Sequence, residues 1–257
     1  MNGTVKAMNT RQPRAYRVAR LAAAQRRTPE TDRTLGILLA TIAGSLNAGG
    51  FLLLSEYTSH MTGHLSAMSG GLVYTNLIML LDSLAAVAGF VAGAALSAAL
   101  IAWGQIRKNR LCYALPLGVQ GVLLASLALI SALPDAIEQR IAIITVCFVM
   151  GLQNATITRI SGARIRTSHA TGLITDMGIE IGRSLYRIVS PHSGVQADTG
   201  RLWLYVQLVV AFVIGGVMGA IGHGMIGWNF AIPPGLALVA LALWSPRHMR
   251  RNQARYA

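Results

Sequence analysis

Long stretches without a charged residue constrain this chain most. Each is close to the roughly 20 residues that an α-helix needs to cross the hydrocarbon core of a bilayer. A soluble domain carries about 25% charged residues, whereas this chain carries 12% and is 53% hydrophobic. The sequence therefore predicts an all-α integral membrane protein and excludes a soluble globular domain. The stretches without Asp, Glu, Lys, Arg or His are residues 35–54, 83–105, 111–133, 141–158, 202–221 and 225–246.

The formal net charge is +13, which in a soluble protein would indicate nucleic-acid binding. The Lys and Arg residues instead cluster beside the apolar segments, without interleaved aromatic residues that would stack on bases. Such clusters are typical of topology determinants that also contact anionic lipid headgroups. We therefore expect membrane lipids, and no nucleic acid, as partners of these clusters.

The positive-inside rule predicts the topology. Basic residues precede the first apolar segment, which places residues 1–33 in the cytoplasm as a basic tail; a mitochondrial presequence of similar composition is the alternative. Residues 61–81 and 167–189 are long but polar. If both re-enter the membrane without crossing it, 21 of the 22 Lys and Arg residues are cytoplasmic, with Arg140 as the exception. We therefore expect six spans, outer loops at residues 134–140 and 222–224, and a second basic cytoplasmic tail at residues 247–257.

Two blocks of sequence recur after just over one hundred residues. Residues 44–48 (GSLNA) match residues 151–155 (GLQNA), and residues 58–63 (TSHMTG) match residues 167–172 (TSHATG). Chance similarity in an apolar chain is the alternative, but the shared Asn, Thr, Ser and His are not generic. We expect two membrane repeats, residues 34–133 and 134–246, each with three transmembrane helices and one re-entrant or interrupted helical segment. Because three is odd, the repeats are inverted relative to each other, as in secondary transporters and some channels.

The repeated polar residues form the candidate binding site, because polar groups inside a membrane are functional candidates. Non-helical backbone at that depth is tolerated only where it is buried in protein or lines a water-filled cavity. Asn47 and Asn154 either bind solute or the broken backbone, or bridge neighbouring helices. Thr62 and Thr171 are predicted N-caps of helices whose N-termini suit an anion. The predicted substrate-binding residues are Asn47, Thr58, His60, Thr62, Gly63, Asn154, Thr167, His169, Thr171 and Gly172.

Three acidic residues are candidates for coupling transport to protons: Asp176, Glu180 and Glu56. Asp176 and Glu180 share a helix face, and Arg183 follows Glu180 by three residues, so a cytoplasmic surface with an ion pair is the alternative. Glu56 is either a vestibule acid or a solvated loop residue. The histidines of the repeated blocks favour hydrogen bonding or proton relay over a metal site, because no acid or Cys completes a ligand set. We expect neither a metal nor another cofactor.

Small residues and cysteines indicate packing. We expect Cys112 and Cys147, in apolar segments, to be free core residues. Spacing by four predicts close helix–helix contacts at Gly89, Gly93, Ser97, Gly215 and Gly219. No nucleotide-binding, zinc-protease or serine-nucleophile pattern occurs, so we expect no enzyme activity.

Residues 43–51 (AGSLNAGGF), residues 60–64 (HMTGH) and residues 151–155 (GLQNA) together resemble the YoaK family of bacterial inner-membrane proteins. The resemblance covers roughly residues 35 to 245, and the Met-Thr-Gly block is its most specific element. Members usually continue this block with Asn, where this chain has His64. The resemblance implies a six-span protein of the bacterial inner membrane and brings no substrate or reaction.

Together these features predict a small secondary transporter or channel-like permease for a small polar or anionic solute, with its site between the two Thr-Gly segments. The alternative is a non-transporting membrane scaffold or sensor that binds lipid or a partner protein. Either protein is compatible with a homo-oligomer.

Overall fold

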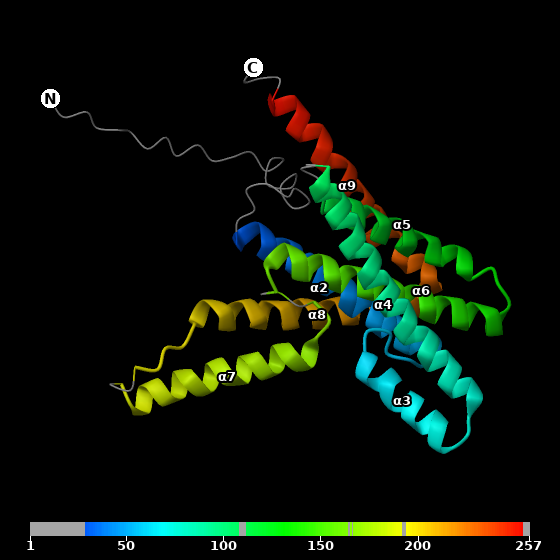
Figure 1. Cartoon of the computed structure of the whole chain (residues 1–257), viewed down its shortest axis with the longest axis horizontal. Helices are drawn as coiled ribbons and strands as arrows, with labels where there is room; N and C mark the ends of the chain where they lie inside the picture. Colours follow the sequence, from blue (N-terminus) through cyan, green and yellow to red (C-terminus); the bar gives the residue numbers. More distant parts are fainter. Residues whose placement is uncertain (1–28, 108–111, 164, 166, 192–193, 254–257) are drawn as a thin grey trace.

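A computed structural model describes residues 29–107, 112–163, 165, 167–191 and 194–253 (Figure 1). Within these residues the secondary structure is helical and contains no strand. The elements are α2 (Pro29–Leu54), α3 (Met61–Val73), α4 (Leu77–Ile106), α5 (Ala114–Ile130), α6 (Asp135–Ser161), α7 (Ala170–Val189), α8 (Thr199–Ile226), the 3-10 helix η1 (Gly227–Ala231) and α9 (Ile232–Gln253).

Four helical stretches of the described residues are long and apolar enough to cross a membrane: Pro29–Leu54, Leu77–Ile106, Ile137–Ser161 and Thr199–Leu243. The last stretch combines α8, η1 and the first half of α9, and α5 is a shorter apolar helix. Large apolar side chains such as Val91, Val122 and Val213 are more than half exposed on these helices. Soluble proteins rarely expose so much contiguous apolar surface. The long apolar helices indicate a multi-pass α-helical membrane protein, as predicted.

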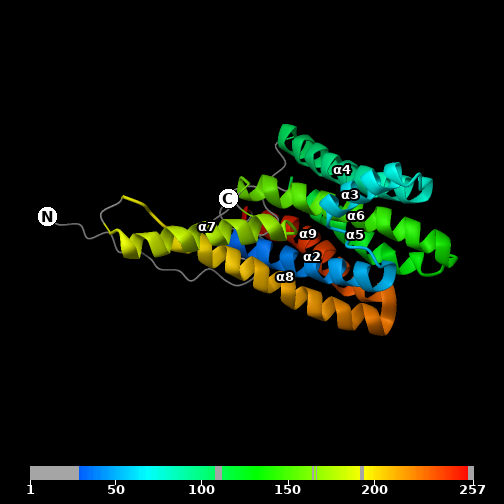
Figure 2. The same cartoon turned by 90° about the horizontal axis from the view of Figure 1, so that it is seen from below.

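Three pairs of helices join the two halves of the sequence (Figures 1 and 2). α2 packs mainly on α8, α4 on α6 and α5 on α9. Two further helices, α3 and α7, lie at the outside of this arrangement, α3 against α4 and α7 against α8. The apolar core lies where α2, α5, α6 and η1 meet, and its largest fully buried side chains include Leu46, Leu124, Met150 and Trp228.

Glycines allow the closest helix contacts. A Cβ atom on Gly44 of α2 would overlap the carbonyl oxygen of Phe212 in α8. A Cβ atom on Gly151 of α6, the matching position of the second repeated block, would overlap the carbonyl oxygen of Phe90 in α4.

The contacts are reciprocal. A Cβ atom on Gly215 would overlap the carbonyl oxygen of Thr41, and one on Gly93 the carbonyl oxygen of Phe148. Such backbone approach needs residues without side chains, which is why small residues mark helix interfaces in membranes. The predicted close packing at Gly93 and Gly215 is therefore confirmed.

Several predicted boundaries were wrong. Residues 134–140 were expected to form a loop, but α6 begins at Asp135 after Pro134, and the carboxylates of its first turn suit a helix N-terminus. Residues 222–224 were also expected to form a loop, but α8 continues to Ile226 and stops where Gly227 takes a φ of 58°. The predicted tails are partly helical, since α2 begins at Pro29 and α9 ends at Gln253; residues 1–28 and 254–257 lie outside the described residues. Helices therefore extend into segments that were expected to form loops and tails.

The chain turns back on itself after α2 and after α6. Both turns use left-handed backbone, with φ of 57° at Ser55, 60° at Gly162 and 64° at Ala163. At these turns the N–H of Ser55 donates to the carbonyl of Phe51, and the N–H of Ala163 donates to the carbonyl of Thr158, as is common at helix ends. From there α3 and α7 start near the middle of the molecule and run outward in opposite directions (Figures 1 and 2).

Candidate functional site

The repeated Thr-Ser-His blocks stand at the starts of α3 and α7. The N-cap residues are His60 and His169, and neither makes a side-chain capping bond. The prediction that Thr62 and Thr171 are the N-caps was therefore wrong by two residues. Helical hydrogen bonding starts earlier than expected, because the carbonyl of His60 already accepts from the N–H of His64. Thr62 and Thr171 lie in the first turn with exposed side chains.

Two asparagines tie these helix starts to the long helices. The Oδ1 atom of Asn47 accepts from the backbone N–H of Ser59 at 3.3 Å and from its hydroxyl at 2.8 Å. Asn154 is 7% exposed; its Nδ2 donates to the hydroxyl of Ser168 and its Oδ1 accepts from that of Thr167. Asn47 thus holds the backbone before α3 directly, whereas Asn154 holds the segment before α7 through the side chains of Thr167 and Ser168.

A buried chain of amides continues from the second block. Gln120 of α5 donates from Nε2 to Oε1 of Gln153 in α6 at 2.6 Å. Nε2 of Gln153 donates to the hydroxyl of Thr167 at 3.0 Å and to the carbonyl of Leu39 at 2.9 Å. Both glutamine side chains are fully buried. The first block has Leu46 at the position of Gln153. The start of α7 is therefore held by three bonds between two side chains, and the start of α3 by one.

The start of α3 holds buried polar atoms instead. The carbonyl of Thr58 accepts from the thiol of Cys147 at 3.3 Å, whereas the Thr58 hydroxyl is buried without a hydrogen-bond partner among the described residues. The Nε2 atom of His64 is also buried and has no partner there. The side chains of Cys147 and Cys112 are buried, as predicted, and the two do not form a disulfide with each other. Gly63 lies beside the ring of His60, which a Cβ atom at Gly63 would approach within 2.8 Å.

Among the acidic candidates, Glu180 is buried, with 5% exposure. Its Oε1 pairs with Arg183 at 3.0 Å, which is the contact considered in the alternative, although the carboxylate is buried and not at the surface. Its Oε2 accepts from the backbone N–H of Asp198 at 2.9 Å. Glu180 therefore joins α7 to the residue before α8. Glu56 is exposed in the turn before α3, and Asp176 is half-buried on α7.

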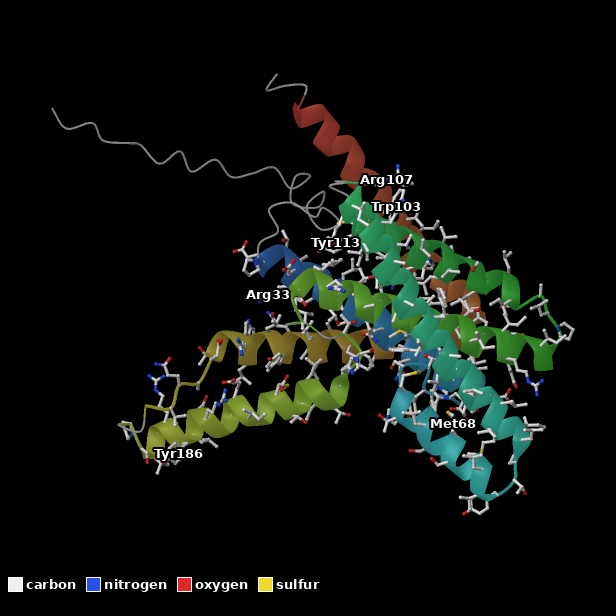
Figure 3. All side chains as sticks on the ribbon, in the orientation of Figure 1. Arg33, Met68, Trp103, Arg107, Tyr113 and Tyr186 are labelled. Carbon is white, nitrogen blue, oxygen red and sulfur yellow. The ribbon has the colours of Figure 1, made fainter. Side chains whose placement is uncertain are left out.

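A cavity of about 570 Å³ lies between α7 and the starts of α2 and α8. This volume is in the range of small-molecule sites. Four of the nine Asp and Glu residues line it, so it is the acidic region of an otherwise basic chain. Figure 3 shows Arg33 at the start of α2, where its Nε donates to Gln207. The charged lining residues are Glu30, Asp32, Arg33, Asp176, Asp198 and Arg201.

A second cavity of about 260 Å³ lies between α4 and α6, beside the start of α7. It contains two predicted residues, Asn154 and His169. Its walls are Phe90, Ala94, Ala98, Gly151, Asn154, Ala155, Thr158, Arg159 and His169.

The predicted site residues thus form two groups, one at the start of each polar helix. Asn47, Thr58 and His60, with Thr62 and Gly63, lie at the start of α3, which packs on α4. The matching group lies at the start of α7, which packs on α8, and consists of Asn154, Thr167, His169, Thr171 and Gly172. Within the described residues, no group of three or more His, Cys, Asp or Glu side chains is arranged to hold a metal ion.

Sequence reasoning missed several residues of these groups. Gln120 and Gln153 were detectable, since an amide in an uncharged apolar segment has to find a partner. Ser59 and Ser168 were part of the repeated block but were not singled out. The charged lining of the larger cavity comes from α2, α7 and α8, and no local pattern indicates that these segments meet.

The fold and the two tethered helix starts define a polytopic α-helical membrane protein with a pair of matched helical segments. A family model described as "Protein of unknown function (DUF1275)" matches residues 35–244. The chain belongs to this family. Comparison with curated proteins and with solved structures gave no match. The narrower resemblance to the YoaK family stays a prediction.

Proposed function

We propose that α2, α4, α5, α6, α8 and α9 cross the membrane and that α3 and α7 re-enter it from opposite faces, which makes the halves inverted repeats. The reciprocal glycine contacts of α2 with α8 and of α4 with α6 support this arrangement. The start of α2 and the ends of α4 and α9 lie on one side of the molecule (Figure 2). That side carries the basic clusters, so both termini face the cytoplasm of a bacterial inner membrane.

An interfacial pair at the end of α4 also supports this orientation. The guanidinium of Arg107 lies 5.7 Å from the ring centroid of Trp103, and Figure 3 shows the two side chains together at this helix end. Trp and Arg are typical of the membrane–water interface, and basic residues are typical of its cytoplasmic side. A reporter fused between α4 and α5, at residues 107–110, is expected on the same side as the amino terminus. A reporter on the opposite side contradicts the six-span arrangement.

On this basis the protein is a small secondary transporter or channel-like permease for a small polar or anionic solute. The carrying observation is the matched pair of helix starts, each tied to a long helix through an Asn–Ser bond. Neither start has a side-chain cap. Apart from Gly63, whose N–H donates to the carbonyl of His60, the first-turn N–H groups can therefore bind a polar or anionic group. Interrupted helices with this feature are used by secondary transporters.

The acidic residues have different roles in this proposal. Glu180 is engaged by Arg183 and by the N–H of Asp198, which is a structural use of its carboxylate. Asp176 lines the larger cavity and is the better candidate for proton coupling. Glu56, exposed before α3, is the corresponding candidate on the other face.

Single cysteines at Thr62 and Thr171 test the proposal, since both side chains are exposed and the native cysteines are buried. A polar, membrane-impermeant thiol reagent is expected to label them from opposite sides, and a transported solute is expected to slow both reactions. A cysteine at the exposed Ser131 is the control, labelled from outside without protection. Labelling of both positions from one side, or of neither, contradicts the proposal.

A non-transporting scaffold or sensor that binds lipid or a partner is the second candidate. One observation favours it: the amides of Asn47 and Asn154 already bond within the protein. A thermal-shift screen of small solutes on purified protein separates the two functions, because a ligand at 100 times its Kd stabilises the native state by about 2.7 kcal/mol. A transporter is expected to respond to a soluble solute, and a scaffold is not.

A further inference from the structure

The cavity between α4 and α6 has two unlike walls. The α4 wall is apolar and consists of Phe90, Ala94 and Ala98, which are spaced by four along one helix face. The opposite wall carries the polar groups, from Asn154, Thr158 and Arg159 of α6 and from His169 before α7. A guanidinium, a hydroxyl and an imidazole beside an apolar surface match a ligand that joins an anionic group to a hydrocarbon chain.

The position of the cavity supports the same ligand. α4 and α6 both belong to the stretches long and apolar enough to span a membrane, and their close contact at Gly93 and Gly151 leaves a groove floored by small residues. Arg159 lies in the last turn of α6, the end that the proposed topology places at the cytoplasmic surface. The cytoplasmic leaflet carries anionic phospholipids.

The other half of the chain provides an internal comparison. Counting on from the matched blocks, Leu52 of α2 stands where Arg159 stands in α6, and Phe51 stands where Thr158 stands. The matching positions of α2 therefore carry neither a cation nor a hydroxyl. This difference fits a site for an anionic headgroup on one side of the membrane alone.

We infer that the α4–α6 groove binds one anionic phospholipid of the cytoplasmic leaflet. Its phosphate contacts Arg159, Thr158 and His169, and an acyl chain lies along Ala98, Ala94 and Phe90. The volume of about 260 Å³ holds the phosphate and the first part of one chain, while the rest of the lipid stays in the bilayer. The choice of leaflet rests on the proposed topology; the binding itself does not require that the protein transports anything.

Native mass spectrometry of the full chain in detergent tests the inference, with phosphatidylglycerol as the anionic lipid and phosphatidylcholine as the zwitterionic one. One tightly bound phosphatidylglycerol is expected. Arg159→Gln is expected to weaken it about tenfold, the size of one charged hydrogen bond. Ala94→Leu, which fills the apolar wall, is expected to weaken it similarly. Arg107→Gln removes an exposed cation of the same side outside the groove and is expected to change the affinity less than twofold.

Three outcomes overturn the inference: equal binding of phosphatidylcholine, an equal loss in Arg107→Gln and Arg159→Gln, or glycerol phosphate binding as tightly as the lipid. The last outcome assigns the site to a soluble phosphate ester. Arg159 is exposed, so its variant tests binding even if Ala94→Leu does not fold. Lipid binding that persists in a protein without transport activity counts against the proposed function and leaves this site intact.

Discussion

The amide pair Gln120–Gln153 gives the sharpest test of the packing. In Gln153→Leu, which copies Leu46 of the first block, the Nε2 group of Gln120 loses its acceptor in a fully buried position. The other partners of Gln153 are less affected. The hydroxyl of Thr167 still donates to Asn154, and the carbonyl of Leu39 belongs to the helical ladder of α2.

The expected cost is therefore that of one orphaned amide. An unsatisfied buried polar group costs about 1–3 kcal/mol, and hydrogen bonds between membrane helices rarely exceed about 1.7 kcal/mol, so we expect about 1–2 kcal/mol. For a chain of this size that corresponds to a fall in Tm of about 2–8 °C. Gln120→Leu/Gln153→Leu removes both ends of the bond and leaves no orphan, so the double variant is expected to be more stable than Gln153→Leu.

The assay is thermal unfolding of the purified protein in detergent. Gln105→Leu, at an exposed position near the end of α4, serves as the matched control and is expected to change Tm by less than about 1 °C. The reasoning is wrong if Gln153→Leu has the same Tm as the wild type. It is also wrong if the Tm losses of Gln120→Leu and Gln153→Leu add in the double variant, because the two side chains would then not depend on each other.

Three further predictions use the same assay. Gly93→Ala places a methyl group against a backbone carbonyl and is expected to destabilise the fold by about 1–3 kcal/mol. Gly182→Ala, with open space around it, is expected to stabilise the fold by about 0.5–1 kcal/mol. Equal effects of the two substitutions would contradict the close α4–α6 contact. Asn154→Ala is expected to destabilise the fold by about 1–2 kcal/mol and Asn47→Ala by about 0.5–1 kcal/mol. The difference arises because Asn154 is more deeply buried and bonds two side chains. A larger loss in Asn47→Ala would refute this explanation. Glu180→Gln is expected to cost at most about 0.5 kcal/mol, since its Arg partner is half exposed. Glu180→Ala also removes the acceptor of the Asp198 N–H and is expected to cost about 0.5–1.5 kcal/mol, the net value of one hydrogen bond, because Asp198 is exposed and its N–H can bond to water. An equal loss in the two variants would show that the charge carries the contact.

Much of the helical framework was predictable from the sequence. Uncharged stretches located the long helices, because a membrane-crossing segment has to be apolar over its whole length. Spacing by four identified Gly93 and Gly215 as contact residues, because the four-residue period places small residues on one helix face. The repeated blocks located the two tethered helix starts before any contact was known.

The details that failed depend on tertiary contacts. Thr62 and Thr171 have good N-cap propensity, but the tethers at Ser59 and Ser168 fix the preceding backbone, so that His60 and His169 take the N-cap position. Segments expected to be loops proved helical, because a helix that extends into water can carry charged residues. The cavity beside Arg33 is lined by segments far apart in the sequence, and the periodicity of one segment does not indicate which distant segment it contacts.

The exchange of partners between the halves has a consequence for biosynthesis. α2 finds its main neighbour in α8, whose first residue, Thr199, follows Leu54 by 145 residues. At ordinary rates of translation, about 5–20 residues per second, α2 waits roughly 7 to 30 s in the bilayer before α8 is synthesised. During that interval its glycine-lined face meets only lipid or other proteins. A nascent chain stalled before residue 199 is therefore a natural target for quality control, and an insertase that shields α2 would speed assembly.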